Sequence, residues 1–269
     1  SWMIISILPV EKSVETNEWL KYRNELNRPL VCAHRGGGEI NPENTKMAFD
    51  YIVENNLADI LEVDIRLTKD LTLVIIHDGS INRTGIIGDS PDVSVRGSTY
   101  EQLRSYNLGC NFVDRNGKKP YKDLSIEEAE EMGLTIMRFD EFLERYQNKG
   151  FKLIIEIKDS DELGIISADK TMDLLNNKFS SWKDDTMIIS YDDNVVDYLN
   201  DKYNNQLIGS LGYKAAWEIV YQKLGLDVFY KANYGALYIP LRFELEDFSI
   251  NIGKKKHIRR SHKRNQIVA

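Results

Sequence analysis

What this chain lacks excludes several common classes of protein. Its 269 residues include only two cysteines, Cys32 and Cys110, too few to make a disulfide framework. Acidic residues outnumber basic ones by 42 to 35, and a net charge of −7 argues against general nucleic-acid binding. No Gly-x-Gly-x-x-Gly motif follows the first strand-like run, which weakens a dinucleotide-binding interpretation. With 42% hydrophobic residues the chain can still bury a sizeable core, and we expect Cys32 to lie in it.

The first 28 residues differ from the rest. The chain opens on the apolar run SWMIISILPV, which is shorter than the roughly 20 residues that a membrane-spanning helix needs. A polar, helix-prone stretch follows. We predict that residues 1–28 pack, as an apolar segment and a helix, on a domain formed by residues 29–269. The apolar run at the start of the sequence either covers the bottom of that domain or is the remainder of a removed membrane anchor or signal peptide.

Histidine is also scarce, yet two of the four histidines fall in one stretch, from Val31 to Asp78. Three apolar, strand-like runs follow one another in it. The first ends at His34, the second carries Glu62 and Asp64, and the third ends at His77. Imidazoles and carboxylates at the ends of strands are an uncommon combination, and they make this stretch the candidate site.

The second and third runs flank a turn at Lys69–Asp70 and predict a β-hairpin. If the turn is centred there, Glu62 lies opposite His77. Because side chains alternate between the two faces of a strand, Glu62, Asp64 and His77 would then share one face. A register shift of one residue would move His77 to the opposite face.

Two carboxylates at i and i+2 on one strand face can form an oxygen pocket for Mg²⁺ or Ca²⁺. Without a cation or a basic partner they would repel each other. The simpler interpretation of an isolated Glu-x-Asp pair is a solvated strand. The neighbours of Glu62 and Asp64 are apolar, however, and carboxylates in such a run are rarely buried without a partner. Glu156 and Lys158 are again spaced i and i+2 at the end of a strand-like run.

Two details next to these runs leave alternatives open. Asn41 and Pro42 have the pattern of a helix start, with Asn41 as N-cap and Pro42 at the first helical position. Asn44 either serves only that helix start or also reaches the site. Arg83, just beyond the hairpin, either positions an anion or is an ordinary surface arginine.

Strand-like and helix-like segments alternate along the chain, which predicts a parallel sheet covered on both sides. Polar residues at the carboxyl ends of several strands indicate an α/β fold of the TIM type, a (β/α)8 barrel, rather than an open doubly wound sheet. A loop-rich insertion of about residues 79–123 would follow the second strand. The predicted strands are 30–34, 60–65, 152–158, 186–191, 206–211 and 235–240, and the predicted helices lie within 125–146, 166–178, 193–204 and 213–223.

The ordered motifs HRGGG, PENT, EVD, LTKD, HD, RTG and EIK resemble those of the glycerophosphodiester phosphodiesterase family, over about residues 30–240. The resemblance implies a (β/α)8 barrel that hydrolyses glycerophosphodiesters to glycerol 3-phosphate and an alcohol, with one divalent cation, Mg²⁺ or Ca²⁺. It also implies roles for seven residues. These are His34 and His77 as catalytic residues, Glu62, Asp64 and Glu156 as metal ligands, and Arg35 and Lys158 as phosphate-binding residues.

The sequence also departs from the pattern of this family. Ser190-Tyr191-Asp192 stands where the family commonly has Ser-Phe-Asp. The family continues with further strands where this sequence stops, so we expect the last one or two barrel strands to be missing. The basic run from Lys254 to Arg264 could contact a membrane surface, although a solvated helix face is the favoured interpretation.

The predicted function is therefore metal-dependent hydrolysis of a small glycerophosphodiester by two-histidine acid/base catalysis. One alternative is a lysophospholipase D-like or phosphoinositide-type phosphodiesterase acting on a lipid. Another is a non-catalytic barrel that only binds phosphodiesters. We expect a soluble catalytic domain, either cytoplasmic or the outward-facing part of a membrane-anchored protein, with no nucleic-acid partner.

Overall fold

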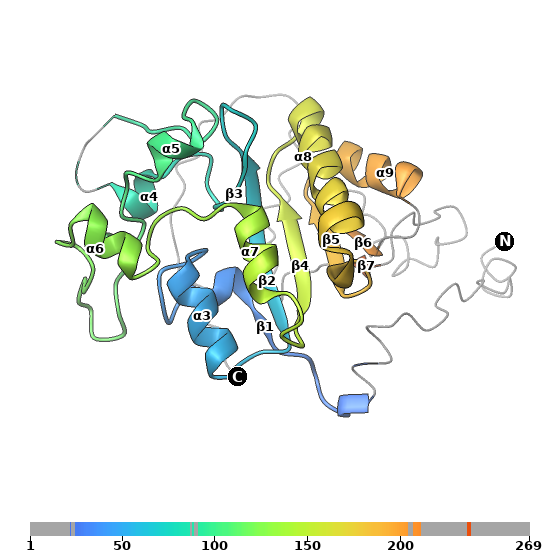
Figure 1. Cartoon of the computed structure of the whole chain (residues 1–269), viewed down its shortest axis with the longest axis horizontal. Coiled ribbons are helices and arrows are strands. Elements are labelled where there is room, and N and C mark those ends of the chain that lie inside the picture. The colour runs from blue at the N-terminus through green and yellow to red at the C-terminus, as the bar shows by residue number, and fades with distance from the viewer. Residues whose placement is uncertain are drawn as a thin grey trace, which may run out of the picture. The chain divides into compact units, whose positions relative to one another are not determined.

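The predicted strands form one mostly parallel sheet (Figure 1). The computed structural model describes residues 22, 25–86, 88, 91–203, 207–210 and 236–237. Within this part of the chain the strand order is β1-β2-β4-β5-β6-β7, and β3 pairs antiparallel with β2 outside that path. The strands are β1 (Cys32–Ala33), β2 (Ile60–Leu67), β3 (Leu73–Ile75), β4 (Lys152–Ile157), β5 (Thr186–Ser190), β6 (Leu207–Ser210) and β7 (Ala236–Leu237).

All six predicted strands of the parallel sheet are confirmed, each within a few residues of its expected bounds. No pairing joins β1 to β7 among the residues described, so closure into a barrel stays a prediction. The expected absence of the last strands, the helix at 213–223 and the basic run from Lys254 to Arg264 concern residues outside the described ranges.

Helices follow the strands and cover the outer face of the sheet. Figure 1 shows α3, α7 and α8 lying along β1, β2, β4 and β5. Two helices do occupy the predicted range 125–146, whereas the helix predicted at 166–178 starts five residues earlier and ends in a π turn. The helical segments are η1 (His34–Gly36), α3 (Lys46–Glu54), α4 (Asn82–Gly85), α5 (Tyr100–Leu103), α6 (Ile126–Glu131), α7 (Phe139–Tyr146), α8 (Asp161–Asp173), η2 (Leu174–Lys178), η3 (Ser180–Trp182) and α9 (Asp193–Lys202).

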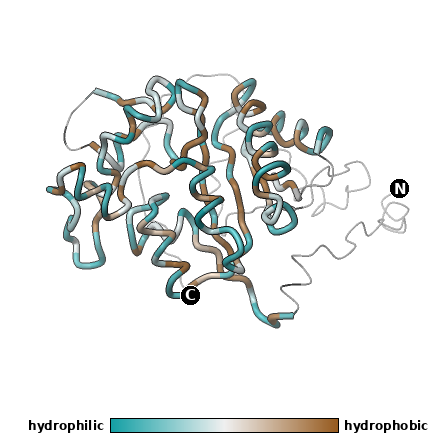
Figure 2. Tube along the Cα trace, viewed as in Figure 1, coloured by the Kyte–Doolittle hydropathy of each residue, from teal (hydrophilic) through white to brown (hydrophobic). Residues whose placement is uncertain are grey.

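Alternation along the strands divides the core into two layers. Leu61, Val63 and Ile65 of β2 face outward and pack in one large apolar cluster with side chains from α3, α7, α8 and α9. Ile60 of β2 faces the other way and packs with Ile154 of β4 and with two residues of β5. Figure 2 shows that the strands are mostly hydrophobic, whereas the helices beside them carry many hydrophilic residues. Cys32 borders this inner cluster but is only partly buried, so the prediction that it lies in the core was wrong.

The inner face changes character along the strands. Ile60 and Ile154 lie in the first half of β2 and β4, whereas Glu62, Asp64 and Glu156 lie beyond them toward the carboxyl ends. In the parallel register, Asp64 is the direct partner of Glu156. The polar groups are therefore gathered at the carboxyl edge of a parallel sheet, where the chain also turns into its loops.

The predicted register of the β2–β3 hairpin was wrong by one residue. The observed pairs are Ile65 with Ile75 and Leu67 with Leu73, and the five residues 68–72 join the strands in place of a two-residue turn. Side chains inside the loop account for its length. Thr68 Oγ1 donates to Asp70 Oδ1 at 2.6 Å and accepts from the amide of Thr72 at 3.0 Å. These local bonds compete with the tight turn that the sequence suggested.

The predicted start of the helix after the glycine cluster was also wrong. Thr45, not Asn41, is the N-cap of α3, and its Oγ1 accepts from Ala48 N at 3.3 Å. The same hydroxyl donates to the carbonyl of Pro42 at 2.6 Å, so Pro42 lies before the helix. The intervening Asn44 has a positive φ of 55°, which prevents the helix from beginning earlier.

The segment predicted as an insertion, 79–123, contains the short helices α4 and α5 and a small apolar cluster that includes Val95 and Leu103. Among the described residues of the chain, no helix is both long and apolar enough to cross a bilayer. The apolar opening of the chain lies outside those residues. At the end of the predicted N-terminal segment, Arg28 makes a bidentate bond to Asp59, at 2.6 and 2.7 Å.

Candidate active site

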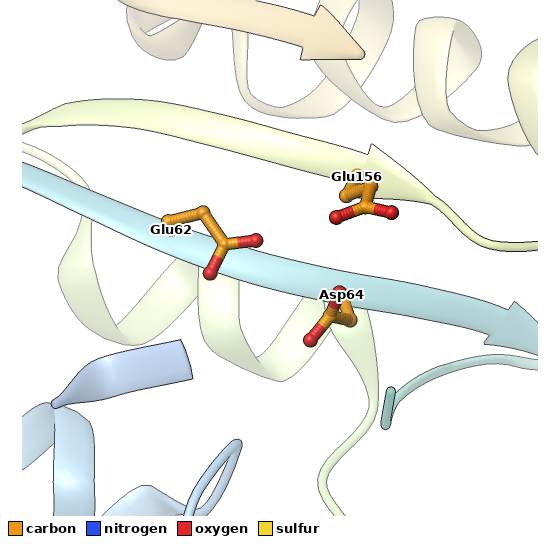
Figure 3. Close-up of side chains that lie close together, drawn as sticks. All are labelled: Glu62, Asp64 and Glu156. Atoms are coloured by element: carbon orange, nitrogen blue, oxygen red, sulfur yellow. The ribbon is translucent and has the colours of Figure 1, made fainter. Parts of the chain in front are cut away.

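Three carboxyl groups gather on neighbouring strands at the carboxyl edge of the sheet (Figure 3). Glu62 and Asp64 come from β2, and Glu156 comes from β4. One carboxylate oxygen of each lies within 4.8 Å of the others. Their exposed fractions are 1%, 0% and 7%, so all three are buried. The prediction that these acids lie close together is confirmed as geometry.

The cluster carries more negative charge than its neighbours balance. Burial, and then the charge of Asp64, raises the pKa of Glu62 well above its ordinary value. Burial also raises the pKa of Glu156, although the Lys158 ammonium opposes the shift. Asp64 Oδ1 accepts no hydrogen bond from any described group, and the Lys158 Nζ atom is 3.8 Å from it. Three acidic oxygens with one buried and unpartnered are the donor set that a hard divalent cation prefers.

His34 and Arg35 lie in the turn that follows β1. Arg35 has a positive φ of 53°, and its amide donates to Glu62 Oε2 at 2.6 Å. Its Nε atom is 3.4 Å from Asp64 Oδ2, so this predicted phosphate-binding residue does lie at the acids. The His34 residue is exposed to solvent. Partial loss of solvent around its ring, and then the charge of Arg35, lower the pKa of His34.

His77 reaches the same cluster by a route that the predicted hairpin did not foresee. The ladder stops at Ile75, so no direct pair with Glu62 forms. Beyond it, His77 Nε2 lies 3.1 Å from Lys158 Nζ, which donates to Glu156 Oε1 at 2.5 Å. The proximity of His77 to the acids was predicted correctly, but through the wrong contact.

Arg66 connects the segment that carries His77 to the segment that carries Lys158. Its Nε donates to the carbonyl of His77 at 2.9 Å, and its Nη1 donates to the carbonyl of Lys158 at 3.2 Å. Sequence reasoning missed this residue. The available signal was its place on β2, two positions after Asp64 and hence on the same strand face.

Asn44 and Tyr191 also border the site. Asn44 Nδ2 donates to Asp64 Oδ2 at 2.8 Å, which shows that Asn44 reaches the site instead of serving the helix start alone. Tyr191 follows β5, and its ring lies 5.3 Å from Lys158 Nζ. The residue as a whole is 61% exposed. Partial loss of solvent, and then the charge of Glu156, raise the pKa of Tyr191.

Arg83 contacts two carboxylates. Its Nε donates to Asp78 Oδ2 at 2.5 Å, and its two Nη atoms donate to the oxygens of Glu43 at 2.6 and 2.8 Å. Arg83 is therefore part of an ion network beside the site, an arrangement that neither sequence-based interpretation described. The contacts of Arg83 with Glu43 and Asp78 were likewise missed, because nothing in the local sequence shows that Glu43 and Arg83, 40 positions apart, meet.

A family model supports the same interpretation. The model of the glycerophosphoryl diester phosphodiesterase family matches residues 34–268. The chain belongs to this family. An uncharacterized protein of Mycoplasma genitalium is 36% identical over 150 residues, which are 55% of this chain and 53% of that protein. A glycerophosphodiester phosphodiesterase of Bacillus altitudinis is 33% identical over 135 residues, 48% of this chain and 45% of the relative. The chain thus spans about half the length of these curated relatives.

Solved structures share the fold. A phosphodiesterase of Oleispira antarctica, in complex with the product sn-glycerol-3-phosphate, has a TM-score of 0.57 at 18% identity, covering 80% of this chain and 86% of that one. A glycerophosphodiester phosphodiesterase of Agrobacterium tumefaciens has a TM-score of 0.52 at 22% identity, covering 68% and 66%. The parallel α/β sheet described above is therefore the fold of known glycerophosphodiester phosphodiesterase structures.

Proposed function

We propose that this protein hydrolyses small glycerophosphodiesters to glycerol 3-phosphate and a free alcohol, with one divalent cation. The main support is the gathering of three buried carboxylates, two cationic side chains and the His77 imidazole at one edge of a parallel sheet, with His34 in the turn after β1. Membership of the family agrees with it, and the Oleispira relative was solved with sn-glycerol-3-phosphate as its product.

Glu62, Asp64 and Glu156 would hold Mg²⁺ or Ca²⁺. When bound, the cation would supply positive charge to the phosphate oxygens and offset the repulsion among the three acids. The buried, unpartnered Asp64 Oδ1 fits this role, because a buried carboxylate oxygen without a donor is costly unless a cation faces it.

Arg35 and Lys158 would bind the phosphodiester anion. Both cations lie against the acid cluster, Arg35 next to Asp64 and Lys158 next to Glu156. A phosphoryl group accumulates charge on its oxygens as the bond to the leaving alcohol breaks, and fixed cations stabilise that charge. The planar guanidinium of Arg35 suits two oxygens at once, whereas Lys158 acts as a point charge.

His34 and His77 would form the acid/base pair. One imidazole takes a proton from the nucleophile, which is either water or the glycerol hydroxyl of the substrate, and the other protonates the leaving alkoxide. His77 has its Nε2 on the side of Lys158 and the acids, and its Nδ1 on Asp78.

The direct test is release of glycerol 3-phosphate from glycerophosphocholine, with Mg²⁺ or Ca²⁺ and with EDTA. We expect the wild type to release glycerol 3-phosphate when Mg²⁺ or Ca²⁺ is present and not in EDTA. The rate of release should fall by about 10²-fold to 10⁴-fold in His34→Ala and His77→Ala. Equal release by the wild type and both variants would exclude the catalytic assignment. Calorimetric binding of glycerophosphocholine without turnover would instead support a non-catalytic barrel, and turnover of lysophosphatidylcholine alone would support a lipid substrate.

A further inference from the structure

A continuous series of hydrogen bonds runs from the loop before α3 to the acid cluster. Glu43 accepts from Arg83, Arg83 donates to Asp78, and Asp78 is bonded to His77 Nδ1 at 2.7 Å. On its other side His77 meets Lys158. We propose that Arg83 and Glu43 are positioning residues that set the tautomer and orientation of His77 through Asp78.

The geometry of Arg83 suits this role. Its Nε is bonded to Asp78 and both of its terminal nitrogens are bonded to Glu43, so all three guanidinium nitrogens are engaged by the two carboxylates. A bidentate arginine–carboxylate pair fixes direction as well as distance. Asp78 is thereby held with one oxygen on Arg83 and the other on His77.

The partners of His77 select one neutral tautomer. Burial alone would raise the pKa of Asp78, but its bonds to His77 and Arg83 lower it far below the ordinary value, so this group only accepts. His77 Nδ1 must then carry the proton. The Lys158 ammonium has only donors to offer, so His77 Nε2 presents its lone pair. The atom able to accept a proton thus faces the acids.

Glu43 connects the two halves of the site. Its Oε1 accepts from Arg83 Nη2 at 2.6 Å and from Arg35 Nη1 at 3.0 Å, and its Oε2 accepts from Arg83 Nη1 at 2.8 Å. Both oxygens of this carboxylate accept hydrogen bonds from arginines, and Glu43 is distinct from the three acids of the cluster. It ties the turn that carries His34 to the segment that carries His77.

The competing explanation is that Arg83 forms only an ordinary surface ion pair. Such exposed pairs contribute about 0–1 kcal/mol to stability and need have no function. The chain offers a matched control. Arg145 bonds both oxygens of Asp50, at 2.7 and 2.8 Å, away from the acid cluster. The side chains of Arg83 and Arg145 are both 43% exposed. A purely structural role would give the two arginines similar effects.

The inference rests on the proposed hydrolysis, and kinetics on glycerophosphocholine with Mg²⁺ test it. We expect Arg83→Gln to lower kcat by about 10-fold to 100-fold with KM nearly unchanged, as for other groups that orient a functional histidine. Arg145→Gln should alter neither. Glu43→Gln should lower kcat and also raise KM, because Glu43 contacts Arg35. Wild-type kcat in Arg83→Gln would overturn the proposal.

A double variant separates positioning from direct substrate contact. If Arg83 acts through His77, adding Arg83→Gln to His77→Ala should cause no further loss of kcat. A second loss of the same size would mean that Arg83 acts on the substrate itself, and would overturn the proposal.

Nitrogen NMR of the imidazoles gives a readout that does not depend on turnover. At mildly alkaline pH we expect His77 to be the Nδ1-protonated tautomer in the wild type and a mixture of tautomers in Arg83→Gln. An unchanged His77 spectrum in that variant would overturn the inference. If the wild type fails to hydrolyse glycerophosphocholine, the proposed function fails, while this spectrum still decides the positioning role.

Discussion

At the scale of single residues, Asp64 is the most constrained group of the site. It is fully buried, one oxygen is bonded to Asn44 Nδ2, and the other has no hydrogen-bond donor among the described residues. Three acids and two cationic side chains, Arg35 and Lys158, leave an excess negative charge in a buried space. We therefore expect the charge of Asp64 to serve function and to lower the stability of the cation-free fold.

Asp64→Asn should make the cation-free protein more stable, by about 1 kcal/mol, because the amide keeps the shape and removes one of three like charges. The same change should abolish the stabilisation that Mg²⁺ or Ca²⁺ gives the wild type. Urea denaturation in EDTA and in excess cation measures both effects. An Asp64→Asn protein that is less stable in EDTA yet still responds to the cation would contradict this account.

Asp59 illustrates a residue whose charge matters for stability alone. The hydrogen bond from Arg28 lowers the pKa of Asp59, with a further contribution from the amide of Val31, and no group of the candidate site is involved. A carboxylate with a depressed folded pKa stabilises the fold above its unfolded pKa of about 3.9, and that contribution is lost as the pH falls through the folded value.

Asp59→Asn should therefore melt at a lower temperature than the wild type at neutral pH, and the difference should narrow below about pH 4. Thermal denaturation over a series of pH values tests this. Asp201→Asn, at an exposed acid on α9, is the control and should follow the wild type throughout. A difference independent of pH would mean that Asp59 acts through packing and not through its charge.

At the scale of elements, the packing of α8 positions the end of β2. Asp159, just before α8, accepts from the amide of Leu67 and from Ser167 Oγ, each at 2.8 Å. Gly164 allows α8 to lie close to α9, since an added Cβ would be 2.4 Å from Val195 Cγ2 and 2.7 Å from the carbonyl of Asp159. Val195 belongs to α9 and the carbonyl of Asp159 is a backbone group, so neither can move at little cost.

Gly164→Ala should lower the free energy of unfolding by about 1–3 kcal/mol, the usual cost of overpacking, despite the better helix propensity of alanine. Gly79→Ala is a suitable comparison, because a Cβ there would meet no atom within 4 Å. Its effect should stay within about 0.5 kcal/mol. Equal stability of the two variants in urea denaturation would show that α8 and α9 can separate without cost.

At the scale of the whole molecule, the proposed cation site would couple folding to cation binding. The acids come from β2 and β4, which are separated by some 90 residues of chain and meet only in the folded sheet. The unfolded chain has no such site, so a cation that binds the folded form must stabilise it.

Mg²⁺ or Ca²⁺ at about 100 times its Kd should stabilise the wild type by about 2.7 kcal/mol. In EDTA the protein should remain folded, with unchanged far-ultraviolet circular dichroism, because Arg35 and Lys158 already offset part of the charge of the acids. Calorimetry with and without EDTA checks both points. An unchanged melting temperature at saturating Mg²⁺ and Ca²⁺ would argue against a cation site in this cluster.

Local sequence patterns determined the fold class and most of the site. The period of two along β2 places Glu62 and Asp64 on one strand face, and their apolar neighbours require that strand to be buried. Apolar runs alternating with helical stretches likewise determined a parallel α/β sheet with polar strand ends. Such features follow from backbone geometry and burial, which act over a few residues, and a single sequence carries them.

The tertiary structure decided the features that depend on long-range contacts. The side chains of Thr68 and Asp70 set the loop length, and the register of the hairpin therefore differs by one residue from the predicted one. Lys158, just after β4, contacts His77 and so connects it to the acids. The contact between Glu43 and Arg83 joins residues 40 positions apart. Each such bond is worth only about 1 kcal/mol and forms once the sheet has brought its partners together, so no local pattern specifies it.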